Sequence, residues 1–409
     1  MSPDTPTTPR APTGPASASG HTPRVLLLFP GVQYDLEHNF RNRLERLSAH
    51  FRGGVFAPGD RQEIVRWGDF TVATYAHRPG QYTRNPIRYF RQGVDFARHM
   101  AEKLGGIDLI VTYDPLKSGL LGAYLARELG AKLVTEVNGD FLDPHIYADI
   151  RHPAVRRAKQ RLYPQIMRQV LRRADGVKLL FPGQLRELEA DCRKATVEAF
   201  PDFCDTEAFY TGPSRPVILF AGFPYQLKGV DVLIRAFQRV ADDFPEWRLR
   251  ILGWFPDRAQ IEADIDGHPR IDLVGPVPRA DMPAQMAQSA LFVLPSRSEA
   301  MGRVLIEAMA AGKPRIGSRV GGIPTLIDDG RDGLLVGPGA VDELADALRE
   351  LLADEGLRER MGARARARYE EELTLDAYFE RLRAFYSRVL NQSGSAQAGL
   401  TRLHAQRAR

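Results

Sequence analysis

The chain has 409 residues, of which 44% are hydrophobic and 26% charged, and its formal net charge is +5. This composition is typical of an ordinary soluble globular protein, and the length favours two domains because single cores stop growing near ~250–300 residues. The mild positive charge suits an anionic ligand or an anionic membrane surface and distinguishes neither, while a total of two cysteines excludes a disulfide framework.

The two ends of the chain differ from its middle. Residues 1–22 are rich in proline and threonine and lack the apolar segment of a signal peptide, which predicts a disordered tail. A flexible basic tail is predicted over residues 391–409. No apolar run approaches the roughly 18–20 residues that span a bilayer. Together with the low cysteine count, this favours a cytoplasmic protein.

Residues 23–205 alternate between strand-like and helix-like patterns. The apolar run "RVLLLF" at residues 24–29 predicts a strand. A helical repeat follows, carried by Leu36, Phe40, Leu44 and Leu47. Further strands are predicted at residues 53–57, 70–76, 106–113, 131–138 and 175–181. Such alternation predicts a first domain with a parallel sheet covered by helices on both faces.

Residues 201–216 break this pattern with three prolines and a glycine, which suits a hinge. A second set of strands is then predicted at residues 216–222, 247–253, 270–277, 290–296, 313–318 and 332–338. The chain is therefore predicted to be an α/β protein of two tandem doubly wound, Rossmann-like domains, 23–205 and 206–373, facing each other across a cleft. Ligands of such sheets lie outside the carboxyl ends of the strands.

Several loops at that edge of the second domain begin helices with glycine. Lys228 precedes one such helix, Gly302 and Arg303 begin another, and Gly322 precedes a third. Helix amino termini present unpaired N–H groups, so these loops predict a phosphate-bearing ligand held by backbone amides and by Lys228. The dehydrogenase motif G-x-G-x-x-G and the P-loop motif are both missing.

Two carboxylates flank the start of the helix that follows Gly302. Glu299 lies in the loop and can point into the cleft, whereas Glu307 lies among apolar positions of the helix and would be partly buried. A buried carboxylate needs partners, and the hydroxyl groups of a ribose would be natural ones. The alternative is a capping carboxylate followed by a solvated helix residue.

The segment "LPSRSEAMGRVLIEAMAAGKPRIGSRVGGIPTLIDDGRDGLLV" at residues 294–336 resembles the signature region of retaining glycosyltransferases of GT-B architecture, glycosyltransferase family 4. The Lys228 loop, "FPDFCDTEAF" at residues 200–209 and "ADGVKLLF" at 174–181 match that family in order and spacing. The resemblance covers nearly all of residues 23–390. It is dense in the second domain and loose in the first, as expected if the first binds a variable acceptor.

The resemblance assigns roles to residues of the second domain. It implies that Glu299 contacts the transferred sugar, that Glu307 binds the ribose hydroxyls, and that Lys228 holds the donor pyrophosphate. Backbone amides near Gly302 and Gly322 would assist. The reaction would proceed with retention of the anomeric configuration, without a metal or another cofactor.

Further implied contacts extend the donor site and place the acceptor. Met301 and Arg303 would bind the donor, Asn138 would act beside Glu299 and Lys228 in catalysis, and Asp140 and Gly31 would contact the acceptor or the sugar. A helix over residues 374–390 would cross back to the first domain.

The chain departs from the family at Phe223, where an arginine is usual, and at Asn138, where a histidine is usual. Asparagine can form hydrogen bonds but cannot titrate, so Asn138 can contact a sugar hydroxyl without relaying a proton; a plain turn role in Asn-Gly is an equal alternative. Two functions stay open. The chain is either a nucleotide-sugar-dependent hexosyltransferase or a non-catalytic nucleotide-sugar-binding partner of such an enzyme.

The segment 151–173 carries eight arginines and lysines and no acidic residue. An apolar stripe at helical spacing runs through it, formed by Val155, Leu162, Ile166 and Val170. Such a helix can contact anionic lipid at the cytoplasmic face of a membrane, but we favour a helix that packs its stripe on the sheet. The expected partners are a nucleotide-sugar donor and a glycan, lipid or small-molecule acceptor, with no nucleic acid.

Overall fold

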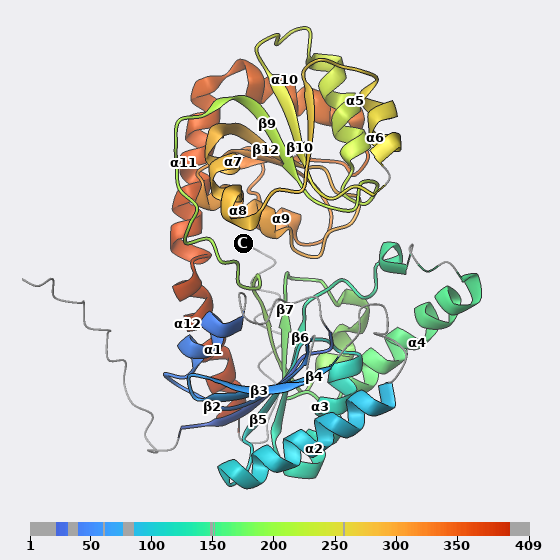
Figure 1. The fold of residues 1–409 in the computed structure, drawn as a ribbon, viewed down its shortest axis with the longest axis vertical. Helices are drawn as coiled ribbons and strands as arrows, with labels where there is room; N and C mark the ends of the chain where they lie inside the picture. The colour runs from blue at the N-terminus through green and yellow to red at the C-terminus, as the bar shows by residue number, and fades with distance from the viewer. Residues whose placement is uncertain are drawn as a thin grey trace, which may run out of the picture.

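Each half of the protein is built around one sheet, and the two halves are stacked along the long axis (Figure 1). The computed structural model describes residues 22–31, 40–59, 62–76, 86–147, 150, 152–256 and 258–392. The predicted fold of two Rossmann-like α/β domains in tandem is confirmed. The predicted tails lie outside the described residues, apart from residues 22, 391 and 392.

The first sheet has eight strands in the order β3-β4-β2-β1-β5-β6-β7-β8. Their bounds are β1 Arg24–Leu28, β2 Arg52–Gly59, β3 Glu63–Trp67, β4 Phe70–Ala76, β5 Leu109–Thr112, β6 Lys132–Val137, β7 Gly176–Leu179 and β8 Thr196–Ala199. All described pairings are parallel except that of β3 with β4. The edge strands β3 and β8 were not predicted, because neither has an apolar run: β3 alternates between half-buried and exposed residues, and β8 has one buried residue.

Four α-helices of the first domain are α1 Arg41–Leu47, α2 Pro86–Leu104, α3 Lys117–Leu129 and α4 Pro153–Leu171. Three residues of the predicted early repeat, Phe40, Leu44 and Leu47, are buried in the core. The fourth, Leu36, lies outside the described residues.

Helix α4 extends beyond the sheet at the side of the first domain (Figure 1). Its carboxyl-terminal end is packed, with Val170 fully buried. Val155 and Leu162 are instead 47% and 55% exposed. The prediction that the whole apolar stripe packs on the sheet is therefore wrong for these two residues, because this part of the helix projects past the strands.

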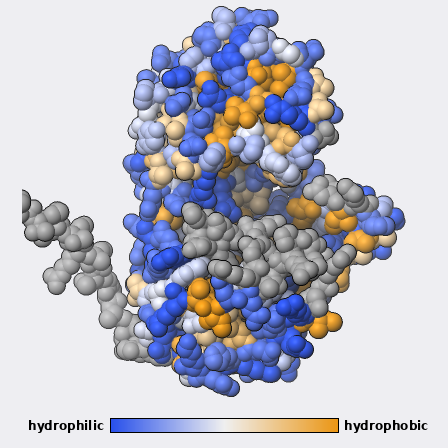
Figure 2. All heavy atoms as spheres, viewed as in Figure 1, coloured by the Kyte–Doolittle hydropathy of each residue, from blue (hydrophilic) through white to orange (hydrophobic). Residues whose placement is uncertain are grey.

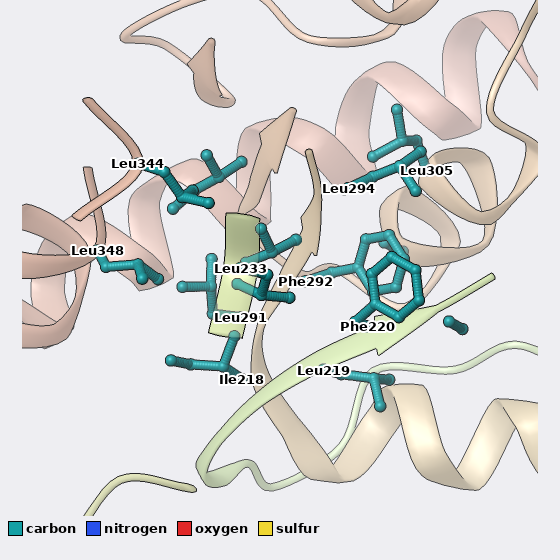
Figure 3. Close-up of a cluster of buried hydrophobic side chains, with 14 of the residues drawn as sticks. Ile218, Leu219, Phe220, Leu233, Leu291, Phe292, Leu294, Leu305, Leu344 and Leu348 are labelled. Atoms are coloured by element: carbon teal, nitrogen blue, oxygen red, sulfur yellow. The ribbon is translucent and has the colours of Figure 1, made fainter. Parts of the chain in front are cut away.

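The second sheet has six strands in the order β11-β10-β9-β12-β13-β14, all parallel. Its strands are β9 Arg215–Ala221, β10 Arg248–Leu252, β11 Ile271–Gly275, β12 Ser289–Leu294, β13 Arg315–Ser318 and β14 Gly333–Val336. Its helices are α5 Val230–Val240, α6 Arg258–Ile265, α7 Met282–Gln288, α8 Arg303–Ala310, α9 Ile323–Leu326, α10 Val341–Ala353 and α11 Glu355–Glu372. Figure 3 shows the core between β9, β12 and α10, where Ile218, Leu291 and Leu344 lie. All six predicted strands are present.

Helix α12, Leu375–Leu390, runs down the side of the molecule from the second domain to the first (Figure 1). It packs into the same core as β1 and β2. The hydroxyl of Tyr386 donates to Glu136 Oε1 at 2.7 Å, and the hydroxyl of Tyr378 donates to Asp202 Oδ1 at 3.0 Å. Fully buried Arg43 donates to the same Glu136 oxygen at 3.3 Å. A buried charge cluster thus joins α12, β6 and the domain junction, and removing one partner would leave another charge uncompensated.

Candidate functional site

A cavity of about 300 Å³ lies between the two domains, beyond the carboxyl ends of the second sheet. It is lined by Asn138, Leu180 and Asp202 on one side and by residues 221–223, Lys228, Leu294 and residues 299–304 on the other. Two of the three predicted loops, those at Lys228 and at Gly302, therefore meet at one place, together with part of the first domain.

Glycine at the start of α5 brings the Lys228 loop against the loop after β12. Gly229 caps α5 with a φ of +68°, and a Cβ there would lie 2.0 Å from the carbonyl oxygen of Pro295. Only glycine fits both constraints. The Lys228 ammonium consequently reaches Glu299, with which it forms an ion pair, and the two side chains are only 16% and 13% exposed. Two of the three predicted catalytic residues are thus direct partners.

The backbone of Glu299 is held by the turn before α9. A Cβ at Gly321, whose φ is +51°, would lie 1.6 Å from the carbonyl oxygen of Glu299. The N–H of Gly322 donates to the same oxygen at 3.3 Å. Gly322 does not line the cavity, and its amide is already engaged, so its phosphate contact stays a prediction. What this turn does is fix the Glu299 loop.

The start of α8 is a second glycine-capped helix start at this cavity. Gly302 caps this helix with a φ of +79°, and Arg303, its exposed first residue, lines the cavity. Buried Met301 also lines the cavity, and its Sδ accepts the N–H of Asp202 at 3.0 Å. The loop before α8 is therefore tied to the domain junction.

Glu307 is partly buried in α8, as predicted. Burial raises the pKa of its carboxyl to about 7, although the charges of Arg279 and Arg303 act in the opposite direction. Glu307 does not line the 300 Å³ cavity. The thiol of buried Cys204 donates to its Oε1, with Sγ and Oε1 3.9 Å apart, so the ribose contact of Glu307 stays a prediction.

Asn138 follows β6 and stands on the opposite side of the cleft from Glu299. Its Nδ2 donates weakly to Glu136 Oε2 at 3.4 Å. Its Oδ1 is buried and, among the residues that the structure describes, has no hydrogen-bond donor. Asn138 also lines a second, larger cavity of about 620 Å³ in the first domain. It is therefore placed where the two cavities meet.

Of the remaining residues considered in the sequence analysis, some line one of these two cavities and others do not. Gly31 lines the larger cavity. Asp140 lines neither, and burial together with neighbouring Asp143 raises the pKa of its carboxyl. Phe223, 44% exposed, packs against Trp254 with ring centroids 4.9 Å apart. The cations among the described lining residues of the 300 Å³ cavity are Lys228 and Arg303.

Two features of the site were missed from the sequence. Ser298, beside Glu299, donates from its hydroxyl to Asp143 of the first domain, which makes a direct contact across the cleft. Asp202 is buried between Lys178, Arg43 and Arg303, whose charges hold the pKa of its carboxyl below the ordinary value despite burial. Neither pairing has a local sequence signal, because the partners are more than 150 positions apart or lie on separate elements.

Family comparisons agree with this two-part construction. The model for a glycosyl transferase 4-like domain matches residues 17–201, and the model for glycosyl transferases of group 1 matches residues 215–354. The alpha-D-kanosaminyltransferase of Streptomyces kanamyceticus is 28% identical over 292 residues, which are 65% of this chain and 72% of the relative. The sulfoquinovosyl transferase of Arabidopsis thaliana is 33% identical over 162 residues, 39% of this chain and 31% of the relative. The chain thus spans less than a third of that second relative.

Solved structures share the fold. Sucrose-phosphate synthase from Thermosynechococcus elongatus superposes with a TM-score of 0.73 at 19% identity, covering 91% of this chain and 100% of the other. Anabaena HepE in complex with UDP gives a TM-score of 0.68 at 19% identity over 90% of this chain and 100% of the other. With one family model on each domain and the same architecture in the solved structures, the chain belongs to the glycosyltransferases of GT-B fold, with a 4-like first domain and a group 1 second domain.

Proposed function

We propose that this protein transfers a hexose from a nucleoside diphosphate sugar on its second domain to an acceptor hydroxyl presented by its first, with retention of the anomeric configuration. One observation carries the proposal. The Lys228–Glu299 ion pair lies at two glycine-capped helix starts, and Asn138, whose Oδ1 has no hydrogen-bond donor among the described residues, lines the same cavity from the other domain. Anabaena HepE, which shares the fold, has been solved with UDP and with UDP-glucose.

The pairing of Lys228 with Glu299 suggests how the donor enters. A diphosphate beside the starts of α5 and α8 would take over the Lys228 ammonium, since charge-assisted contacts to phosphate are strong. Glu299 would then be released to accept hydrogen bonds from sugar hydroxyls. Glu307, half protonated near pH 7, would lose its proton and accept from the ribose.

The transfer step needs no titrating side chain from the first domain. Asn138 orients the acceptor hydroxyl but cannot remove its proton. We assign that role to the leaving phosphate oxygen: the bond from the anomeric carbon to the phosphate breaks, the bond to the acceptor oxygen forms on the same face, and the proton passes to the phosphate. Lys228, Arg303 and helix-start amides stabilise the charge on the phosphate, so we propose that no metal takes part.

A panel of nucleoside diphosphates in a thermal-shift assay tests donor binding first, because a ligand at ~100 times its dissociation constant adds ~2.7 kcal/mol of stability. Incubation of the matching nucleotide sugar with acceptor candidates follows, with and without a chelator. We expect chelator-resistant transfer and, by NMR, the donor's own anomeric configuration in the product. Binding without transfer or donor hydrolysis would instead establish the non-catalytic partner.

Peripheral contact with an anionic membrane is a further part of the proposal. The structure describes no helix that is both long and apolar enough to cross a bilayer. On α4, Arg156, Arg157 and Arg161 are exposed beside Leu162. Vesicle sedimentation tests this contact: anionic phosphatidylglycerol vesicles should retain the protein and neutral ones should not. Charge reversal at Arg157 should weaken retention, whereas reversal at exposed Lys194, elsewhere on the first domain, should not.

A further inference from the structure

The larger cavity of the first domain has walls of a distinct kind. It measures about 620 Å³, within the size range of small-molecule sites. Five aromatic rings line it, those of Tyr89, Phe90, Tyr113, Phe141 and Tyr163. They come from α2, from the loops after β5 and β6, and from α4. Aromatic walls contributed by four separate segments favour a ligand with an apolar or aromatic body.

Two lysines add positive charge to this aromatic cavity. Lys117 lies deeper, where its ammonium donates to the carbonyl of Pro30 at 3.1 Å and lies 4.1 Å from the Tyr89 ring centroid. Lys159, on α4, has its ammonium 5.9 Å from the Tyr163 ring centroid, and no described residue forms an ion pair with it. The cavity is thus apolar along its walls and cationic at α4.

The carboxylate that lines this cavity, Asp114, forms hydrogen bonds within the first domain. Asp114 is buried, and its Oδ1 accepts the backbone N–H groups of Leu116 and Ser118 at 2.6 and 3.2 Å. These bonds hold the start of α3. The charge of neighbouring Lys117 and these N–H groups stabilise the carboxylate, and Asp114 forms no ion pair with Lys159 among the described residues.

The surface around the cavity extends its apolar character. Leu120, which lines the cavity, is 40% exposed, Ile87 next to lining residue Pro86 is 79% exposed, and α3 contacts both α2 and α4. Figure 2 shows hydrophobic residues exposed among hydrophilic ones on the α4 side of the first domain. An apolar chain longer than the cavity would continue over this surface without leaving apolar contact.

We propose that the acceptor is an anionic amphiphile, with its apolar or aromatic body against the five rings, its anionic group at Lys159 and its reactive hydroxyl at Asn138. This inference rests on the proposed function and names the acceptor class for it. Asn138 lines both cavities, so a ligand in the larger one presents its hydroxyl directly to the donor cavity. A neutral glycan can stack its C–H faces on such rings but would leave Lys159 without an anionic partner.

Calorimetric titration of the whole chain with three probes tests the acceptor class: decyl phosphate below its micelle concentration, neutral decyl glucoside and inorganic phosphate. We expect decyl phosphate to bind at least about tenfold more tightly than either other probe, because it alone has both an alkyl chain for the aromatic rings and a phosphate for Lys159. Equal binding of decyl glucoside would overturn the anionic part, and equal binding of inorganic phosphate would overturn the apolar part.

Variants locate the binding within the cavity. Lys159→Gln should remove most of the advantage of decyl phosphate and leave decyl glucoside unchanged, whereas Tyr163→Ala should weaken both alkyl probes. Lys194→Gln, an exposed lysine outside the cavity, should change neither. An unchanged decyl phosphate affinity in Lys159→Gln would overturn the assignment. Affinity for the nucleoside diphosphate is measured in parallel for the parent and each variant. If none of these proteins binds the nucleotide, the proposed function is wrong; if they bind it but the probes behave otherwise than expected, only the acceptor class is wrong.

A competition arm separates the two sources of such an acceptor. Vesicles of phosphatidylcholine that contain phosphatidic acid should displace decyl phosphate if the amphiphile is drawn from a lipid surface. Displacement by free decyl phosphate analogues alone, with no effect of the vesicles, assigns a soluble amphiphile of the same chemistry. Displacement by pure phosphatidylcholine vesicles to the same extent would contradict the role of the anionic group.

Discussion

The two cavities that meet at Asn138 are built by different means. The second-domain side of the 300 Å³ cavity is shaped by backbone. Gly229, Gly302 and Gly321 all have positive φ, and a Cβ at Gly229 or Gly321 would clash with a neighbouring carbonyl oxygen. The 620 Å³ cavity of the first domain is shaped by side chains from four segments. A position with positive φ and no room for a Cβ accepts only glycine, whereas a position in an aromatic wall accepts several residue types. Only the glycine positions therefore leave a recognisable sequence pattern.

The largest expected effect breaks the donor side alone. Lys228→Ala should reduce kcat about a hundredfold or more, because losing one well-placed donor to developing negative charge costs ~3–4 kcal/mol in the transition state. Transfer assays under donor saturation measure this effect, with Lys194→Ala as the matched control on an exposed lysine. Near-normal turnover of Lys228→Ala would contradict both the assignment of Lys228 to the pyrophosphate and the proposal that donor binding separates Lys228 from Glu299.

A smaller effect concerns Glu307, whose substitution should act on donor binding more than on the bound complex. Glu307→Gln should raise the donor KM about tenfold with kcat less affected, since a carboxylate accepts two ribose hydroxyls and an amide accepts through one oxygen only. An unchanged KM with a collapsed kcat would contradict the ribose assignment.

The pH dependence sharpens that assignment. Because burial raises the pKa of Glu307 to about 7, a donor that needs the carboxylate should bind more tightly as the pH rises through 7, and binding should release a proton. Ionising a buried carboxylate disfavours the folded state, so the free energy of unfolding of the parent should fall as the pH rises from about 4.5 to about 7. At pH 8, Glu307→Gln should therefore be more stable than the parent by up to ~3 kcal/mol. Donor titrations and chemical unfolding at pH 6 and 8 measure both trends; pH-independent donor affinity in the parent would contradict them.

The smallest predicted effects lie at the cations around the pyrophosphate. If Arg303 substitutes for the arginine that the chain lacks at Phe223, Arg303→Ala should reduce kcat/KM about tenfold, and Phe223→Arg should restore part of that loss in the double variant. The measurement is a double-mutant cycle on donor kcat/KM. Additive effects of the two substitutions would show that these positions do not share a ligand group.

The difference between the cavities also explains what the sequence could predict. All strands except β3 and β8, the glycine-capped loops and the partial burial of Glu307 followed from apolar runs and fixed spacings. The exposure of Leu162 did not, because an amphipathic pattern cannot tell whether the sheet reaches far enough to cover it. The contact of Ser298 with Asp143 depends on how the domains are placed, and no local pattern carries that information.

The aromatic cavity shows the same limit for function. Tyr89, Tyr113 and Tyr163 are ordinary core or helix-face residues when read along the chain. These residues line one cavity only because the topology brings α2, α4 and the loop after β5 together at the carboxyl ends of the strands of the first sheet. The cavity of the first domain therefore needed the structure, whereas the glycine-capped loops of the second domain could be predicted from the sequence.

One crossed measurement tests most directly whether the two cavities divide the work. Affinities for the matching nucleoside diphosphate and for decyl phosphate are determined by calorimetry for the parent, for Lys228→Ala and for Lys159→Gln. We predict that Lys228→Ala loses nucleotide affinity and keeps decyl phosphate affinity, and that Lys159→Gln does the reverse. Loss of both ligands in a folded single variant, or retention of the nucleotide by Lys228→Ala, would contradict the account.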